Sequence, residues 1–165
     1  MLKAKLLLQR LLENEIDFVL VGGLAATMYG ASTVTYDADI CFDFSRQNIE
    51  RLRIALQDLH PRVRAQQDWM PLAGLPLEQL ESLKNLYLQT DGGGLDLLGS
   101  LAEIGDYQRV KHRSTKIALF GRSCRILDID ALIEIKEKLD RPKDRQVALE
   151  LKAILEKKKV SRVDI

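Results

Sequence analysis

The sequence predicts an α+β fold in which helices back a mixed β-sheet, with residues 1–165 forming one domain. First, 165 residues is the length of a typical single domain. Second, 46% apolar and 30% charged residues is the composition of an ordinary globular chain. Third, helical and strand patterns succeed one another without an internal repeat, and no apolar run approaches the roughly 18 residues of a membrane span. We therefore expect no membrane-crossing segment.

The first half of the chain alternates helical and extended patterns. Leucines recur at helical spacing near the start, and an apolar, β-branched run then ends in two glycines. The expected elements are a helix over 2–15, a buried strand over 17–23, a short helix over 24–29, a strand over 37–44 and a helix over 46–60. We expect Ser45 to cap this last helix and Pro61 to stop it.

The second half begins with a segment that reads as a loop or lid. Residues 61–76 hold three of the four prolines and the only tryptophan. The elements expected after it are a hairpin over 85–90 and 95–98, a helix over 101–110, a hairpin over 115–120 and 124–128, and helices over 129–139 and 144–158, with a frayed end at 159–165.

Charge and cysteine content exclude several classes of protein. The 25 basic and 24 acidic residues leave a net charge of +1, which is typical of neither a general nucleic-acid binder nor an acidic scaffold. Cys41 and Cys124 are too few for a disulfide framework and lack metal-ligand spacing, so we expect buried, inert thiols. The N-terminal leucines read as a helix and not as a signal peptide. These features favour a cytoplasmic protein.

Three aspartates are candidate metal ligands. Asp37 and Asp39 lie two apart on a predicted strand, so both carboxylates point to one face. Asp96 interrupts the apolar run Leu95-Asp-Leu-Leu, where an unpaired carboxylate would be costly to bury. Oxygen ligands of this kind suit Mg²⁺. The alternative is a carboxylate pair at a strand end with an edge aspartate that faces water.

Gly22 and Gly23 join the first strand to a helix. Glycines at such a turn let backbone N–H groups approach a phosphate, and the helix dipole adds to this effect. Leu24 and Thr27 occupy positions where a dinucleotide-binding motif needs glycine, and the chain has no P-loop lysine. A tight turn without a ligand is the alternative.

Lys136 lies in the middle of the apolar stripe of the helix over 129–139. A lysine there extends its ammonium group to solvent, pairs with a buried acid or points into a site. Asp144 falls near the edge of the corresponding stripe on the last helix.

Together, these elements resemble the nucleotidyltransferase fold of the DNA polymerase β superfamily, and in particular small bacterial AbiEii-like nucleotidyltransferases. The resemblance rests on Val19-Leu-Val-Gly-Gly, on Thr35-Tyr-Asp-Ala-Asp-Ile and on Leu95-Asp-Leu-Leu. The tail from Leu132 to Asp144 resembles the final motifs of that family. The likeness spans about residues 16–155.

The resemblance implies a Mg²⁺-dependent enzyme that moves NMP from an NTP, most simply ATP, to a hydroxyl group of an RNA, a protein or a small molecule. Two Mg²⁺ ions would act in such a site. The implied roles are metal binding and catalysis for Asp37, Asp39 and Asp96, phosphate binding for Gly22 and Gly23, nucleotide binding for Lys136, and a partly structural tail motif for Arg141, Lys143 and Asp144.

One departure from the family pattern keeps other functions open. Thr33 stands where close relatives carry an arginine. A binding partner that has kept the fold without turnover, for example in a toxin–antitoxin pair, is therefore an alternative. A metal-dependent nuclease could use the same acids, but the sequence offers it no convincing base.

The acceptor surface is not defined by the sequence. A chain of this length leaves little room for a separate acceptor domain, so a partner or a homo-oligomer would supply that surface. A basic cluster could contact RNA phosphates or simply face solvent; its members are Arg109, Lys111, Arg113, Lys116, Arg122 and Arg125.

Overall fold

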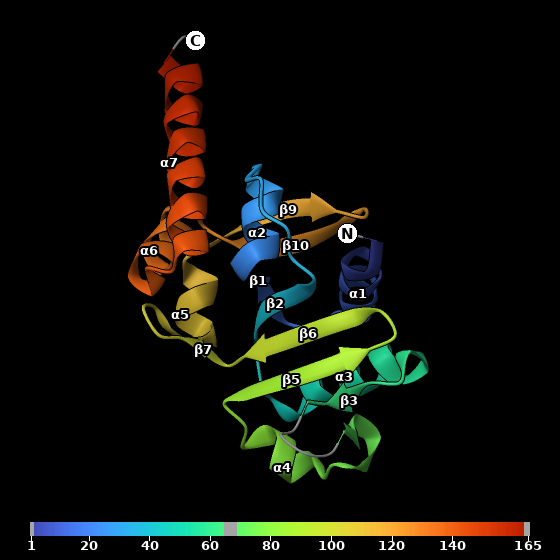
Figure 1. Cartoon of the computed structure of the whole chain (residues 1–165). Helices are drawn as coiled ribbons and strands as arrows, with labels where there is room; N and C mark the ends of the chain where they lie inside the picture. Colours follow the sequence, from blue (N-terminus) through green and yellow to red (C-terminus); the bar gives the residue numbers. More distant parts are fainter. Residues whose placement is uncertain (1, 65–68, 164–165) are drawn as a thin grey trace.

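The computed structural model describes residues 2–64 and 69–163, whose strands and helices are shown in Figure 1. The strands are β1 (Phe18–Leu20), β2 (Asp37–Phe42), β3 (Arg62–Val63), β4 (Met70–Pro71), β5 (Asn85–Thr90), β6 (Gly93–Leu98), β7 (Ser100–Leu101), β8 (Gly105–Asp106), β9 (Ser114–Leu119) and β10 (Arg122–Leu127). The helices are α1 (Leu2–Glu13), α2 (Gly22–Tyr29), α3 (Arg46–Leu56), α4 (Leu77–Glu81), α5 (Tyr107–His112), α6 (Ile129–Leu139) and α7 (Pro142–Val163), with short 3₁₀ turns η1 (Gln57–Leu59) and η2 (Leu72–Gly74).

A mixed sheet forms the centre of the fold, as the sequence predicts. Its strand order is β4-β3-β5-β6-β2-β1-β10-β9. β2 runs parallel to β6 and β1 runs parallel to β10, whereas the other neighbours are antiparallel. β7 and β8 form a separate two-stranded ribbon. Because β2 and β6 lie far apart in the chain, their pairing joins the two halves of the sequence.

Apolar side chains alternate with polar ones along the central strands. On β2, Ala38 and Ile40 are fully buried while Asp37 and Asp39 remain partly exposed. The amphipathic helix α1 packs on β2, β6 and β10 and on the neighbouring helix α3. Leu7, with none of its surface exposed, is among the α1 side chains that enter this core. The period-two pattern therefore gives the sheet one apolar face and leaves the acids on the other.

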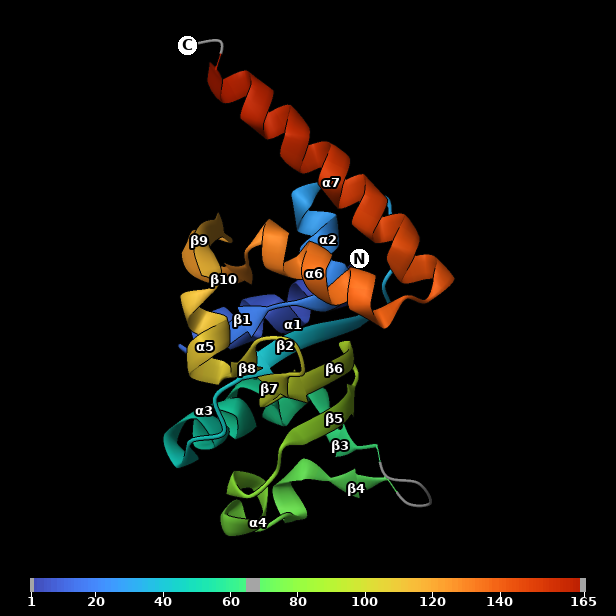
Figure 2. The same cartoon turned by 90° about the vertical axis from the view of Figure 1, so that its left-hand side faces the viewer.

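The C-terminal helices pack together beside the sheet. α6 and α7 contact each other, and both contact α2. Figures 1 and 2 show the far end of α7 projecting well beyond the sheet. The predicted helix over 144–158 is longer than expected, because it begins at Pro142, a residue favoured in a first helical turn, and continues to Val163 through the stretch expected to fray. Residues 164 and 165 lie outside the described chain.

The helix predicted over 46–60 is shorter in the structure. The helix expected over 46–60 ends at Leu56 and passes through the 3₁₀ turn to His60, which adopts a left-handed φ of 46° before Pro61. A residue that precedes proline is disfavoured in the α conformation, so the helical path does not continue through His60. Ser45 occupies the N-cap position but its side chain makes no capping hydrogen bond.

The helix expected over 101–110 is wrong in its first half. The ribbon of β7 and β8 occupies that stretch, and α5 begins only at Tyr107. Asp106 sets this start, because its side chain accepts a hydrogen bond from the backbone N–H of Arg109 at 3.1 Å.

The segment 61–76, expected to be a loop or lid, contains two short strands. β3 pairs with β5, and β4 pairs with β3, so the segment extends the sheet. Two-residue strands are too short to show a periodic pattern, which is why the sequence does not predict them. Residues 65–68, within the same segment, lie outside the described residues.

Both cysteines are free and buried, as expected. Burial raises the pKa of Cys41 to about 12 and that of Cys124 to about 11. Thiols in this state are poor nucleophiles at neutral pH. Within the described residues, no helix is both long enough and apolar enough to span a bilayer.

Asn48 joins the ends of β1 and β2 to α3. Its side chain, which is 1% exposed, accepts a hydrogen bond from the Asp17 N–H at 2.8 Å. It also donates to the carbonyls of Asp17 and Asp43 at 2.9 and 2.8 Å. Without this side chain, the Asp17 N–H and the Asp43 carbonyl would lose these partly buried hydrogen bonds, whereas the Asp17 carbonyl would keep the one it accepts from the Asp43 N–H at 3.3 Å.

We therefore expect Asn48→Ala to lower the free energy of unfolding by about 1–3 kcal/mol, because partly buried backbone groups left without partners are costly. Chemical denaturation monitored by circular dichroism would measure the loss. Asn85→Ala, at an exposed position of β5, is the matched control and should stay within about 0.5 kcal/mol of wild type. Equal losses in both variants would contradict this role of Asn48.

Candidate active site

The pairing of β2 with β6 brings the three predicted aspartates to one face of the sheet. Asp39 lies directly opposite Asp96, and Asp37 lies opposite Gly94. Neighbouring strands are about 4.8 Å apart, so the carboxylates share a small surface. The structure thus brings together the three acids that the sequence singles out. None of them is deeply buried, because this face of the sheet is partly open to solvent.

Two glycines leave room for these carboxylates. A Cβ at Gly22 would overlap the carboxylate of Asp39, and a Cβ at Gly94 would overlap that of Asp37. Gly22 also has a φ of +64°, which favours glycine. Asp39 and Asp37 therefore pack directly against glycine backbone. A side chain at Gly22 or Gly94 would displace them.

Asp39 is held in an unusual electrostatic environment. Burial raises its pKa above the ordinary value, and the negative charge of Asp37 adds to this effect. A hydrogen bond from the backbone N–H of Gly23 and the positive charges of Lys136 and Arg64 act in the opposite direction. Gly23 therefore directs its amide toward the acidic face, which is where the sequence places a phosphate-binding turn.

Lys136 is fixed beside this face by a buried partner. Its Nζ lies 2.7 Å from a carboxylate oxygen of Asp144, and the two side chains are only 12% and 4% exposed. The Nε of Arg141 contacts the other oxygen of Asp144 at 2.5 Å. Burial opposes ionisation of Asp144, but the hydrogen bonds and charges of Lys136 and Arg141 outweigh it and hold the pKa of Asp144 below its usual value. Of the alternatives open for Lys136, pairing with a buried acid is therefore observed.

Arg64 is a site residue that the sequence does not reveal. It follows β3, and its guanidinium forms ion pairs with Asp96 and, at 3.4 Å, with Asp37. Its backbone N–H donates to the carbonyl of Tyr87 at 2.8 Å, which extends the pairing of β3 with β5. The only sequence signal is the alternation Arg62-Val63-Arg64, which is too short to identify a strand.

The donor chemistry of this face fits a magnesium ion. Mg²⁺ prefers carboxylate oxygens and keeps water or phosphate in its remaining positions. Asp37, Asp39 and Asp96 supply such oxygens, and the glycine backbone beside them leaves space. As the side chains stand in the described part of the chain, no three His, Cys, Asp or Glu residues are grouped as a metal site. Arg64 supplies the positive charge between Asp37 and Asp96.

Several solved structures share the fold of this chain. The lincosamide antibiotic adenylyltransferase LnuA, solved with lincomycin bound, matches with a TM-score of 0.63 and 16% identity over 92% of this chain and 96% of its own. The antibiotic-resistance factor ANT(2'')-Ia matches with a TM-score of 0.56 and 16% identity over 98% of this chain and 94% of its own. A Thermotoga maritima protein provisionally assigned as a nucleotidyltransferase matches with a TM-score of 0.52 and 15% identity over 87% and 86% of the two chains.

The chain has the nucleotidyltransferase fold. This confirms the resemblance at the level of the fold, while the AbiEii-like subtype stays a prediction. No protein-family model and no curated protein sequence matches the chain.

The tail motif supports the nucleotidyltransferase fold by holding the segment that precedes β2. The Nζ of Lys143 donates to the carbonyl of Val34 at 2.9 Å. The carbonyl of Thr33 accepts from the hydroxyl of Thr27 at 3.4 Å. Thr33, at the position where an arginine was expected, is thus half-buried against α2, and Lys143 makes a structural contact.

The basic cluster does not lie among the acids. Its residues belong to α5, β9, β10 and the turn between α5 and β9, and β10 is separated from β2 by β1. Arg113 pairs with Glu134 at 2.8 Å and with Asp130 at 3.6 Å. Arg125 donates to the hydroxyl of Ser114 at 3.2 Å. Part of the cluster therefore stabilises the fold.

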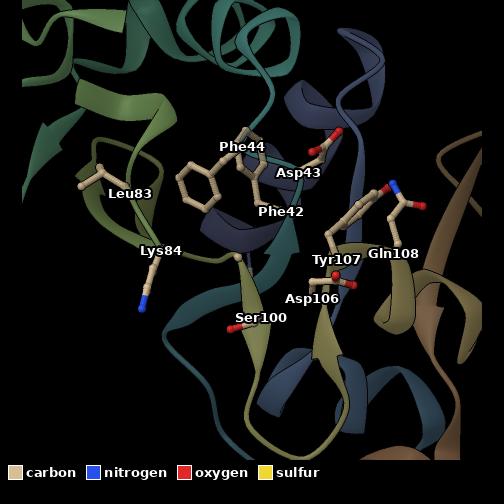
Figure 3. A pocket seen from close by; sticks show the side chains of 10 residues that line it. Phe42, Asp43, Phe44, Leu83, Lys84, Ser100, Asp106, Tyr107 and Gln108 are labelled. Atoms are coloured by element: carbon tan, nitrogen blue, oxygen red, sulfur yellow. The ribbon is translucent and has the colours of Figure 1, made fainter. Parts of the chain in front are cut away.

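A cavity of about 440 Å³ opens at the other end of β2 (Figure 3). Phe42 and Tyr107 contribute aromatic surface to it, and Asp43 and Asp106 lie beside them. None of the residues predicted for the site lines this cavity. It is separate from the acidic face.

We expect Gly22→Ala to lower the free energy of unfolding by about 1–2 kcal/mol from left-handed backbone strain and by about 1–3 kcal/mol more from its overlap with Asp39. Gly121→Ala is the matched control, because Gly121 has a similar φ of 73° and open space where its Cβ would lie. Urea denaturation of both variants isolates the overlap. Equal losses would show that Gly22 is needed only for its backbone conformation.

Asp144→Asn should lower the free energy of unfolding at pH 7 by about 3 kcal/mol, because it leaves Lys136 partly buried without a counter-charge. A depressed carboxyl pKa stabilises the fold above the unfolded value of about 3.9. This contribution is lost as the pH falls through the lower pKa of the folded protein. Denaturation at pH values from 7 to 2 should therefore show the gap to wild type closing in acid. The control Asp140→Asn, at a residue 70% exposed, should cost less than about 1 kcal/mol at every pH.

Proposed function

We propose that this protein is a Mg²⁺-dependent nucleotidyltransferase that transfers NMP from an NTP, most simply ATP, to a hydroxyl group. The observation that carries the proposal is the convergence of Asp37, Asp39 and Asp96 on one open face over bare glycine backbone. A cluster of negative charge is unfavourable in the free protein unless cations compensate it. Such a cluster is suited to binding divalent cations together with a triphosphate.

In the proposed reaction, an acceptor oxygen forms a bond to the α-phosphorus as the bond to the bridging oxygen breaks and pyrophosphate leaves. When bound, two Mg²⁺ ions would stabilise charge on the attacking and leaving oxygens. Asp37 and Asp39 would hold both ions, and Asp96 would complete the site. Asp96 would also accept the proton of the acceptor hydroxyl.

The remaining residues position the nucleotide. The backbone of Gly22 and Gly23 can approach the phosphates, because neither residue has a side chain in the way and both begin α2. Lys136 adds positive charge next to Asp39, and Asp144 fixes its direction. Lys143 holds the tail to the segment before β2 and Arg141 pairs with Asp144, so their proposed roles are structural.

The chemical class of the acceptor is proposed from the solved structures that share the fold. LnuA is named as an adenylyltransferase of lincosamide antibiotics, and ANT(2'')-Ia has been solved with adenylyl-2''-tobramycin. These neighbours favour a small hydroxyl compound as the acceptor. An RNA or a partner protein is the second class we propose, because some members of the basic cluster, such as Arg122, are exposed on the hairpin of β9 and β10.

A catalytically silent binding partner is the alternative function. The observation that favours it is Thr33, a neutral residue where the resemblance leads us to expect an arginine beside the acids. Without that charge, binding of the triphosphate would be weaker.

Nucleotide binding by the wild type and Asp39→Ala decides between these functions. With Mg²⁺ and one NTP at about 100 times its Kd, stability should rise by roughly 2.7 kcal/mol, which raises the Tm on the order of 5–10 °C. Thermal unfolding would detect this shift, and Asp39→Ala should lose it. Asp91→Asn, at an exposed acid of the β5–β6 turn, is the control and should keep it.

Incubation with α-labelled NTPs and mixtures of RNA, protein or small hydroxyl compounds then tests transfer. A label on one class of acceptor identifies the substrate. Nucleotide binding without transfer to any class would favour the silent partner, and the absence of a shift with every NTP would contradict a nucleotide site. Strand cleavage without label transfer would indicate a nuclease.

A further inference from the structure

Arg64 lies where the acidic face would hold a cation. Its guanidinium bridges Asp96 and Asp37, which belong to adjacent strands. These are two of the three carboxylates that would bind Mg²⁺. The guanidinium occupies one oxygen of each carboxylate and places a positive charge where the metal would lie, so it opposes the binding of a second cation there.

The bridge is only partly stabilised by its surroundings. The Nε of Arg64 is buried and has no hydrogen-bond partner among the described residues. The Arg64 side chain is 30% exposed, and its guanidinium lies 5.9 Å from the centre of the Tyr87 ring, which is itself exposed. An open path to solvent and an unsatisfied donor are features of a side chain that can leave its position. Lys136, by contrast, is tied to a buried partner.

We infer that Arg64 acts as a built-in counter-ion, which neutralises Asp37 and Asp96 in the metal-free protein and must swing away when a divalent cation binds. The inference rests on the proposed function, because it assigns the metal to these carboxylates. Its consequence is that metal binding and the Arg64 bridge exclude each other. The measured metal affinity is then reduced by the fraction of protein in which the bridge is formed.

Arg62, the first residue of β3, offers a matched control. It lies two residues before Arg64, so its side chain leaves the same face of the sheet. Arg62 is exposed, and no carboxylate lies within ion-pair distance of it in the described part of the chain. Replacing it removes the same charge from the same face without breaking the bridge.

Calorimetric titration with MnCl₂, without nucleotide, tests the inference on the wild type, Arg64→Gln and Arg62→Gln. If the bridge is formed in nine tenths of the free protein, Arg64→Gln should bind Mn²⁺ about tenfold more tightly than wild type. Arg62→Gln should stay within about twofold. Arg64→Lys, which keeps the charge but not the planar fork that bridges two carboxylates, should fall between wild type and Arg64→Gln.

A measurement on the wild type does not depend on the variants folding. Addition of Mg²⁺ should shift the Nε–H nuclear magnetic resonance signal of Arg64 and leave that of Arg62 in place. An Arg64→Gln affinity equal to that of Arg62→Gln, or an unmoved Arg64 signal at saturating Mg²⁺, would overturn the inference while leaving the proposed function intact. Failure of every form of the protein, wild type included, to bind either metal without nucleotide would also overturn the inference, whereas the proposed function is contradicted only if Mg²⁺ with each NTP also leaves the Tm unchanged.

Discussion

The parallel pairing of β2 with β6 determines where the three aspartates of the acidic face lie relative to one another. It sets Asp39 directly beside Asp96 and places Asp37 one step along the same face. Like charges opposite each other weaken a sheet. The pairing is nevertheless central to the fold, because the other face of the same strands carries Ile40 and Leu97, both fully buried. Burial of that apolar face thus holds the carboxylates together against their repulsion.

Two cationic side chains, Lys136 and Arg64, reduce the repulsion among these carboxylates, and they differ in how firmly each is held. Lys136 comes from a helix and is fixed by Asp144, which is itself almost completely buried. Arg64 follows a short strand, and among the described residues its guanidinium contacts the carboxylates that it neutralises and the ring of Tyr87. One cation therefore belongs to the framework of the site, and the other is retained by the charge it compensates.

The sequence reveals those parts of the site that depend on local periodicity. The spacing of Asp37 and Asp39 predicts a shared face, and the position of Lys136 on an apolar stripe marks that lysine as unusual while leaving open whether it reaches solvent, pairs with a buried acid or enters a site. The parallel pairing that brings Asp96 next to Asp39 is non-local, so the sequence supports it only through the resemblance to a known fold. Arg64 escapes prediction because two-residue strands such as β3 have no detectable period. The same reason explains why 61–76 reads as a loop and why the ribbon of β7 and β8 reads as part of a helix.

The difference between the two cations has a physical origin in the sheet. Lys136 and Asp144 come from adjacent helices that pack on each other, so moving either side chain would expose apolar surface. Arg64 lies near the sheet edge, where β3 has only the two-residue strand β4 beyond it and solvent is close. A charge at such an edge can exchange its partner for water at little loss of packing. Lys136, the permanent positive charge beside the acids, therefore lies between packed helices. Arg64, the exchangeable one, lies near the edge of the sheet.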